Sequence, residues 1–340
     1  MRITAFWIVC LLITLILGCN RGPARPDKIS HEDSLRVVIS DLNKQISGNE
    51  KDASLFYGRA KVYFDLKEIN QALNDINKAI QIDPKKAAYY ITLSDIYLQM
   101  GQPRNCEESL QKAVSVDPEN VNAYLKLANF YLIVKDYSNV DHYVKEVITR
   151  DKTNATARFT RALALIETGD TAHAVGDLMD AVKLNQLYFE AYMLLGDLFS
   201  TRKDPLAAGY YNNALRIRPN SKEAMYSLGM FYQESGQFPK AIGTYEVLSK
   251  LDTTFRDAPY NIGYINLVYL QNFEKAVEYF TKAIVRDSGY ADSWYNRGLS
   301  YEQMKEYQKA YDDYQKALKL KVNYDKAVQG LNRLDKLMKK

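Results

Sequence analysis

Cysteine and histidine, the side chains most often used as nucleophiles and metal ligands, are scarce in this sequence. Its 340 residues contain three of each, namely Cys10, Cys19, Cys106, His31, His142 and His173. None of them stands with further cysteines, histidines or carboxylates at the spacing of a zinc site. The sequence also has no glycine-rich phosphate loop and no Gly-x-Ser-x-Gly motif. We therefore predict no enzymatic activity, no metal site and no cofactor, and we interpret Cys106 as a buried packing residue.

The cysteine with the most informative surroundings is Cys19. Arg2 is followed by an apolar run over residues 3–17, which is shorter than the roughly 20 residues that span a bilayer. The run ends in Ile16-Leu17-Gly18-Cys19, which resembles a bacterial lipobox, although Leu17 stands where a small residue is more usual. The resemblance implies a signal peptide over residues 1–18 and acyl chains on Cys19. An uncleaved signal anchor and an ordinary secretory signal remain alternatives.

This resemblance implies a bacterial protein of the cell envelope, held by its lipid anchor at the periplasmic or outer-membrane face. Several acyl chains on one residue anchor stably, whereas a single chain binds only marginally. Residues 19–29 contain two prolines and almost no apolar side chain, which predicts a tether. Ser30 then begins an N-terminal capping helix within residues 30–52.

Composition and charge exclude two broad classes of protein. The chain is 47% hydrophobic and 25% charged, which is typical of folded proteins and excludes wholesale disorder. Its 45 basic and 41 acidic side chains give a formal net charge of +4. A balance this even gives no reason to expect a nucleic-acid partner.

From residue 53 the sequence repeats with a period close to 34 residues. The clearest series consists of small residues in one phase: Ala60, Ser94, Ala128, Ala162, Gly196, Gly229, Gly263 and Gly298. Two further series of mostly small residues follow twelve or so and then seven residues later in each unit. Small side chains at these spacings let two antiparallel helices approach closely, so each repeat is predicted to be a helix pair.

Glycine and proline mark the predicted helix ends. Gly101, Gly169 and Gly236 fall between the paired helices, where a residue with positive φ ends the first helix. The dipeptides Asp83-Pro84, Asp117-Pro118 and Arg218-Pro219 fall after the second helix, because the residue before proline leaves the α region.

These repeats resemble the tetratricopeptide repeat family, most clearly in Trp294-Tyr295-Asn296-Arg297-Gly298 with Tyr301, Ala310, Tyr314 and Ala317. The resemblance implies an all-α, right-handed α-solenoid of about eight helix pairs over residues 53–324. The predicted repeats are 53–86, 87–120, 121–154, 155–188, 189–221, 222–255, 256–290 and 291–324. We place a one-residue deletion near Asp204 and a one-residue insertion near Asn272.

A stack of this kind needs a solvated cap at each end. Residues 325–340 supply the C-terminal one, with Ala327, Val328, Leu331, Leu334 and Leu337 expected on its packed side.

In this family the first helices line a concave groove that holds a segment of a partner. Carrying those positions over gives a candidate partner-binding groove of Tyr57, Phe64, Asp95, Asn129, Phe159, Glu190, Asp197, Glu223, Tyr226, Glu234, Tyr260, Tyr264, Asp292 and Tyr295. The groove positions are rich in carboxylates and aromatics, whereas lysines predominate on the second helices. We therefore expect a protein or peptide partner with Lys or Arg and apolar anchors.

The function predicted from the sequence is a membrane-tethered scaffold or adaptor that binds another protein. The alternative is a surface lipoprotein that binds glycans or peptides, with tyrosine pairs such as Tyr89-Tyr90 and Tyr210-Tyr211 as stacking platforms. A plainer interpretation of the charges is that helical surfaces are charged for solubility and the acidic groove is incidental.

Overall fold

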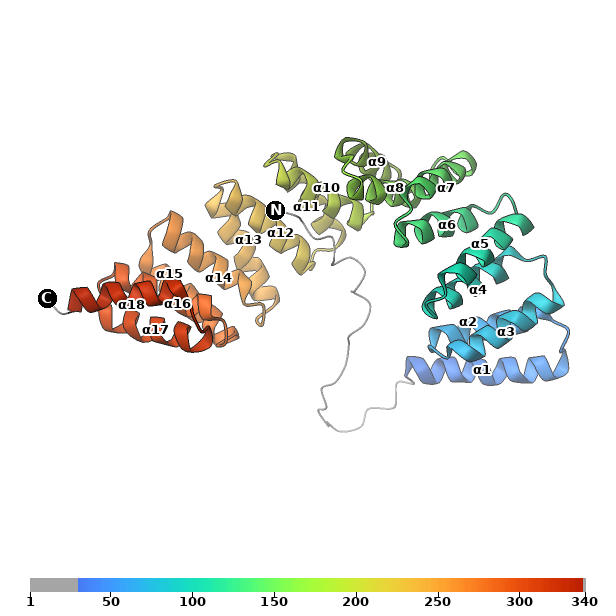
Figure 1. The fold of residues 1–340 in the computed structure, drawn as a ribbon, viewed down its shortest axis with the longest axis horizontal. Helices are drawn as coiled ribbons and strands as arrows, with labels where there is room; N and C mark the ends of the chain where they lie inside the picture. Colours follow the sequence, from blue (N-terminus) through green and yellow to red (C-terminus); the bar gives the residue numbers. More distant parts are fainter. Residues whose placement is uncertain (1–29, 339–340) are drawn as a thin grey trace. The chain divides into compact units, whose positions relative to one another are not determined.

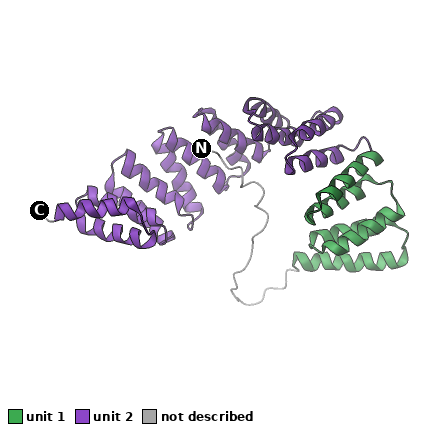
Figure 2. Cartoon of the chain, in the orientation of Figure 1, with its two compact units in different colours: residues 1–116 green, residues 117–340 purple. Residues whose placement is uncertain are grey.

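The computed structural model describes residues 30–338, and every element in that range is helical (Figure 1). The predicted α-solenoid of stacked helix pairs is confirmed. The chain divides into two compact units, one ending at Val116 and one beginning at Asp117 (Figure 2). The sequence suggested one continuous array, so this division is new. The signal peptide, Cys19 and the tether lie outside the described residues. No helix in the described range has the length and apolar content needed to cross a bilayer.

The first unit holds one single helix and two helix pairs. Its elements are α1 (His31–Gly48), α2 (Ala53–Asp65), α3 (Ile69–Ile82), α4 (Ala87–Gln99) and α5 (Pro103–Val116). The Ser30 hydroxyl accepts a hydrogen bond from Asp33 N at 3.0 Å, which satisfies an otherwise unpaired donor at the start of α1. Ile46 at the other end of α1 packs into a core with Phe56, Ala60 and Ile76. The helix therefore covers the apolar side of the first pair, as a cap does.

The second unit stacks six helix pairs and ends in a single helix. The pairs are α6 (Val121–Ile133) with α7 (Tyr137–Arg150), α8 (Ala155–Glu167) with α9 (Thr171–Leu184), α10 (Phe189–Thr201) with α11 (Leu206–Ile217), α12 (Lys222–Glu234) with α13 (Phe238–Leu251), α14 (Asp257–Tyr264) and the π-helix η1 (Ile265–Tyr269) with α15 (Phe273–Arg286), and α16 (Ala291–Gln303) with α17 (Tyr307–Leu320). The final helix is α18 (Asp325–Met338).

Each pair turns through one residue with positive φ. Gly101, Gly169 and Gly236 have φ of 68°, 86° and 72°, as their place in the sequence predicted. Five other turns use a residue with a side chain at the same point: Lys67, Lys135, Lys203, Gln271 and Lys305. A left-handed conformation costs such a residue about 1–2 kcal/mol, so the turn geometry is imposed by the packing of the two helices and not by local preference.

Inside each pair, a small residue on the first helix is matched by a large one on the second, normally sixteen residues later. Alanine or serine is matched by an aliphatic residue, in the buried pairs Ala60 and Ile76, Ser94 and Leu110, Ala128 and Val144, and Ala162 and Leu178. Glycine is matched by an aromatic ring, in the pairs Gly196 and Tyr211, Gly229 and Tyr245, Gly263 and Phe280, and Gly298 and Tyr314. A Cβ added to any of these glycines would lie 2.5–3.0 Å from that ring, so only glycine admits the aromatic partner.

The two irregular repeats show where a residue is lost or gained. Gly196 and Tyr211 are fifteen residues apart, which places the deletion in the turn between α10 and α11 and agrees with its predicted position near Asp204. The insertion near Asn272 was predicted too late in the chain. It lies in η1, where Leu270 N donates to Ile265 O at 3.1 Å across one residue more than an α-turn spans. The helix absorbs the extra residue as a π-turn, so the loop that follows keeps its length.

Three repeats carry a buried ion pair across the two helices. The guanidinium groups of Arg59, Arg161 and Arg297 each make two hydrogen bonds to a carboxylate sixteen residues later, at 2.6–2.8 Å. The acceptors Asp75, Asp177 and Asp313 are 4–7% exposed. Other repeats have an apolar residue at the arginine position, as in Leu93 with Ser109 and Leu228 with Thr244. The pair is therefore interchangeable with an uncharged one in this fold.

The C-terminal cap packs on a stripe that agrees with the predicted one only in part. Ala327 and Leu334 are buried as expected and Leu331 packs against the same core, but Val328 and Leu337 are 38% and 46% exposed. Gly330 takes their place, because the Tyr314 ring occupies the space where its Cβ would stand. The buried stripe follows residues at i, i+3 and i+7, and Val328 and Leu337 fall on its flanks.

Candidate protein-binding surface

The fourteen predicted groove residues lie on the first helices and none of them is buried. Tyr57, Phe64 and Asp95 belong to α2 and α4 of the first unit. The other eleven belong to α6, α8, α10, α12, α14 and α16 of the second unit. The structure therefore presents two separate sets, and the larger set is described first.

Aromatic residues of the larger set pack against the next repeat. In each case the partner is an aromatic residue of the loop that precedes the next repeat's first helix or, at the end of the chain, α18. Ring centroids lie 4.9 Å apart for Phe159 and Tyr188, 5.6 Å for Tyr226 and Phe255, 5.2 Å for Tyr260 and Tyr290, and 5.3 Å for Tyr295 and Tyr324. Such contacts contribute about 0.5–1.5 kcal/mol beyond their buried area. These aromatics therefore join repeats, which leaves them only partly available to a ligand.

Other predicted positions are also engaged within the protein. Asn129 accepts a hydrogen bond from Thr160 Oγ1 at 2.9 Å, which links α6 to α8. Tyr264 packs against Tyr260 and Tyr269. In the first unit, Tyr57 stacks on Tyr89 with centroids 4.8 Å apart, and the Lys67 ammonium lies over the Phe64 ring. These positions contribute chiefly to the packing of adjacent repeats or turns.

Some carboxylates of the second unit are neutralised by the chain's own arginines. Arg218 pairs with Glu190 at 2.6 Å and lies over the Phe189 ring at 4.0 Å. Arg333 on α18 makes two 2.8 Å hydrogen bonds to Glu302. The sequence alone did not indicate these arginines as partners, because they come from the loop or helix of a following element. A basic residue about one repeat after an acidic one is the signal that would have found them.

Three carboxylates on α10 and α12 have no such partner. Among residues 30–338, no lysine or arginine forms an ion pair with Asp197, Glu223 or Glu234. All three are exposed. Asp197 accepts a hydrogen bond from the Tyr211 hydroxyl at 2.7 Å, and that ring is the one that fills the space beside Gly196. The buried Tyr211 thus fixes the position of the Asp197 carboxylate from the core side of the helix pair.

Asp197 and Glu223 lie close enough to influence each other. Desolvation raises the pKa of Asp197, the Tyr211 hydrogen bond lowers it, and the negative charge of Glu223 raises it further. A cation placed between these two carboxylates would relieve their repulsion. Met193, Tyr226 and Met230 on the same two helices supply apolar neighbours, and Met193 is largely covered.

Asp292 on α16 is held differently. It accepts a hydrogen bond from the hydroxyl of Tyr324, in the loop before α18, and forms no ion pair within the described range. The neighbouring rings of Tyr260 and Tyr295 are each engaged with the next repeat. Asp292 therefore belongs to a tyrosine-rich inter-repeat contact.

The tyrosine pairs suggested as sugar platforms are largely in the core. Tyr89 and Tyr90 are 6% and 7% exposed, and Tyr211 is 2% exposed. Tyr210 packs on Phe199 with ring centroids 5.2 Å apart. A sugar needs an open ring face, which Tyr89, Tyr90 and Tyr211 do not offer.

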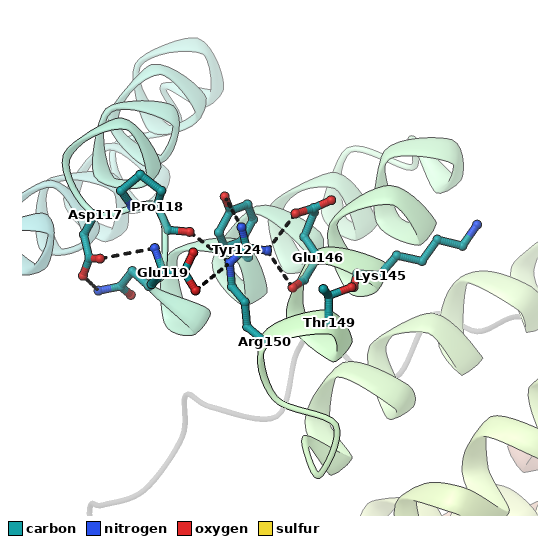
Figure 3. A network of polar contacts seen from close by, with 9 residues as sticks. Asp117, Pro118, Glu119, Tyr124, Lys145, Glu146, Thr149 and Arg150 are labelled. Carbon is teal, nitrogen blue, oxygen red and sulfur yellow. Dashed lines mark hydrogen bonds and ion pairs between the residues drawn. The ribbon is translucent and has the colours of Figure 1, made fainter.

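A further arginine, Arg150, organises the start of the second unit, and the sequence did not indicate its role (Figure 3). Arg150 at the end of α7 donates from Nε to Pro118 O at 2.9 Å and from Nη1 to Glu146 Oε2 at 2.7 Å. Its guanidinium also lies over the Tyr124 ring at 4.1 Å. These contacts join the loop before α6 to both helices of its pair. Arg286 repeats the arrangement on α15, donating to Phe255 O at 2.8 Å.

The residues considered for catalysis are placed without catalytic geometry. Cys106 is 2% exposed inside the α4–α5 pair. His142 and His173 are exposed, and His173 Nδ1 contacts Asp170, the N-cap of α9. Within residues 30–338, no three His, Cys, Asp or Glu side chains are grouped as metal ligands.

Sequence profiles described as tetratricopeptide repeat match residues 53–86, 87–120, 159–221, 210–243, 258–288 and 291–324. Together these matches cover more than half of the chain. The chain belongs to the tetratricopeptide repeat family. Its repeats form a scaffold of the kind that binds other proteins.

The solved structures that are similar to this chain share little sequence identity with it. The C-terminal part of a TPR repeat-containing protein from Cytophaga hutchinsonii is 17% identical, with a TM-score of 0.62 over 70% of this chain and 98% of that one. MamA is 23% identical over 48% of this chain and 91% of its own, with a TM-score of 0.44. YrrB, described as a TPR protein with an unusual peptide-binding site, is 18% identical over 56% and 98%, with a TM-score of 0.43. No curated protein sequence matches the chain.

Proposed function

We propose that this tetratricopeptide repeat protein is a membrane-tethered scaffold of the cell envelope. We further propose that its helices α10 and α12 bind a partner segment that carries lysine or arginine. The observation that carries the proposal is the group of exposed carboxylates without an internal cation, Asp197, Glu223 and Glu234. Together with Met193, Tyr226 and Met230 they are called here the α10–α12 face.

We place the binding site on α10 and α12 because other carboxylates of the predicted surface are already paired with arginines of the chain. Glu190 and Glu302 already pair with Arg218 and Arg333, so a ligand cation would have to displace an internal arginine there. At Asp197 and Glu223 a ligand cation displaces only water and relieves repulsion between two carboxylates. The half-buried side chains of Tyr226 and Met230 beside them suit the apolar part of such a segment.

Charge reversal tests this proposal. The triple variant Asp197→Lys, Glu223→Lys and Glu234→Lys is expected to lose its partner in a pull-down from crosslinked cells followed by mass spectrometry. A matched control reverses three exposed carboxylates elsewhere in the same unit, Glu274, Asp312 and Asp335, and has the same net charge. The control is expected to keep the partner. Equal recovery with both variants would favour the plainer interpretation, in which these charges serve solubility.

The membrane tether is tested separately at Cys19. Its sequence context supports acylation, so Cys19→Ala is expected to release the protein from membranes and to abolish labelling by radioactive palmitate. Continued membrane retention without labelling of the wild-type protein would refute the lipid anchor. That result would leave the proposal for the α10–α12 face untouched.

A further inference from the structure

Four second helices of the second unit end in the same type of sequence. The last four residues are Ala-Val-Lys-Leu in α9, Ala-Leu-Arg-Ile in α11, Leu-Ser-Lys-Leu in α13 and Ala-Leu-Lys-Leu in α17. The first residue of each is fully buried in its helix pair. The third residue is an exposed cation, and these cations are Lys183, Arg216, Lys250 and Lys319.

Within residues 30–338 these cations have no ion-pair partner. None of the four forms an ion pair with a carboxylate in the described range, whereas Lys145, Lys222, Lys282 and Lys309 of the same unit all do. The last four residues of these helices also contain no carboxylate. The two arginines one position further along, Arg150 on α7 and Arg286 on α15, instead fold back onto loop carbonyl oxygens.

An apolar side chain stands beside each free cation. Leu184, Leu251 and Leu320 are 39%, 40% and 38% exposed, and Ile217 is partly exposed. The loops after α9 and α17 add Leu187 and Val322, at 74% and 80% exposed. Because each stacked repeat offers equivalent positions, these residues occupy the same place in four of the six helix pairs of the unit. They are called here the basic–apolar edge.

Helix electrostatics explain the cations of this pattern but not the exposed apolar side chains beside them. A cation in the last turn stabilises a helix by interacting with its dipole, by about 0.3–1 kcal/mol. The dipole gives no reason for an exposed leucine next to the cation. A shallow hollow lined by Leu215, Arg216, Pro219 and Met225 adjoins the edge at α11. Cations and aliphatic side chains in alternation are the composition of surfaces that bind the interface of a membrane.

We propose that the basic–apolar edge binds the surface of an anionic phospholipid membrane. The lysines and Arg216 would contact lipid phosphates, and the leucines would enter the boundary between headgroups and acyl chains. A lipid surface fits better than an acidic protein, because the feature repeats over several helix ends with the same simple chemistry. The inference does not depend on acylation of Cys19, nor on the α10–α12 face.

The test uses the chain from Ser30 onward, which lacks the apolar segment and Cys19. The core clusters of the described residues lie wholly within this part, so it is expected to keep its fold. Sedimentation with vesicles of phosphatidylcholine alone, and with phosphatidylglycerol added, measures binding. We expect binding only to the vesicles that contain phosphatidylglycerol, and binding that weakens as salt is added.

Two variants with a matched control identify the surface. The quadruple change of Lys183, Arg216, Lys250 and Lys319 to Gln is expected to weaken binding more than tenfold, since each cation near an anionic membrane contributes about fivefold. The control changes Lys145, Lys222, Lys282 and Lys309 to Gln, has the same net charge, and is expected to bind nearly as the parent does. Changing Leu184, Leu251 and Leu320 to Ser is expected to weaken binding without any change in charge.

Circular dichroism of each variant verifies that it is folded. Equal loss in the quadruple variant and its control, or equal binding to both vesicle types, would overturn the proposal. Binding to polyglutamate but not to anionic vesicles would also overturn it, in favour of an acidic protein. None of these three results would bear on the binding of a basic partner at the α10–α12 face.

Discussion

The ring of Tyr245 occupies the space in which a β-carbon of residue 229 would stand. A Cβ built on Gly229 would lie 2.5 Å from Tyr245 Cε1. Tyr245 is fully buried, so its ring has no free space into which to move. The pair illustrates a rule of this chain, in which glycine on the first helix is matched by an aromatic ring on the second.

Gly229→Ala is therefore expected to destabilise the second unit by about 1–3 kcal/mol, the usual cost of overpacking. Adding Tyr245→Leu should recover much of this loss, because Ala162 with Leu178 is the same combination in another repeat. Urea unfolding measures the free energies. Gly243→Ala in α13 is the control, since its Cβ would meet nothing within 4 Å, and it should stabilise by up to about 1 kcal/mol. Additive effects of the two core changes would contradict the proposed complementarity.

The ion pair of Arg297 and Asp313 predicts that removing the arginine lowers the stability by an amount that depends on pH. Arg297→Leu leaves a buried, unpaired carboxylate and should cost about 3–5 kcal/mol near neutral pH. Adding Asp313→Ser recreates the Leu93 and Ser109 combination and should restore most of the stability.

The sign of the pH dependence follows from burial. Desolvation already raises the pKa of Asp313 despite Arg297, and removing the arginine raises it further. The folded Arg297→Leu variant then holds a proton that the unfolded chain releases at about pH 4. Its deficit should shrink as the pH falls toward 4 and be largest near neutrality. A deficit that does not change with pH would show that the carboxylate is not buried in the variant.

Lysine in a left-handed conformation offers a site for stabilisation. Lys135 and Lys305 have φ of 63° and 62°, and glycine adopts such angles without strain. Lys135→Gly and Lys305→Gly should each raise the stability by about 0.5–1 kcal/mol, visible as a higher thermal midpoint. The reciprocal control Lys145→Gly, inside α7, should lower it by about 1 kcal/mol. A lower midpoint for both turn variants would contradict the turn geometry.

Buried and half-buried tyrosines predict unfolding at alkaline pH. Desolvation, followed by the hydrogen bond to Glu246, raises the pKa of Tyr279 to about 12, and desolvation raises the pKa of Tyr211, Tyr245 and Tyr314 as well. The unfolded chain ionises its tyrosines near pH 10. Their contribution to stability is therefore complete below about pH 10 and is lost as the pH rises above it.

Tyrosinate absorbance and circular dichroism, recorded along one pH titration, measure this effect. A fraction of the 27 tyrosines should ionise only together with the loss of helical signal. Ionisation of every tyrosine near pH 10 with the helical signal intact would contradict the burial of these rings.

The repeat period, the helix pairs, the three glycine turns and the Ser30 cap could be predicted from the sequence. These features are local or periodic, so a residue's type and its distance along the chain are sufficient to identify them. The small residues at Ala60 and its equivalents indicated close helix contacts for the same reason. The buried role of Cys106 followed from its place in this period.

The packing of Tyr226 on Phe255 and the pairing of Glu190 with Arg218 depended on how one repeat lies against the next. Both joined partners are about thirty residues apart, and the sequence states only that an aromatic ring or a carboxylate faces outward. Stacking then decides which charges are compensated within the chain, because compensation depends on distance in space. The carboxylates on α10 and α12 were predicted as groove residues from the sequence, but only the tertiary structure shows that they and the cations at the four basic helix ends form no ion pair within residues 30–338.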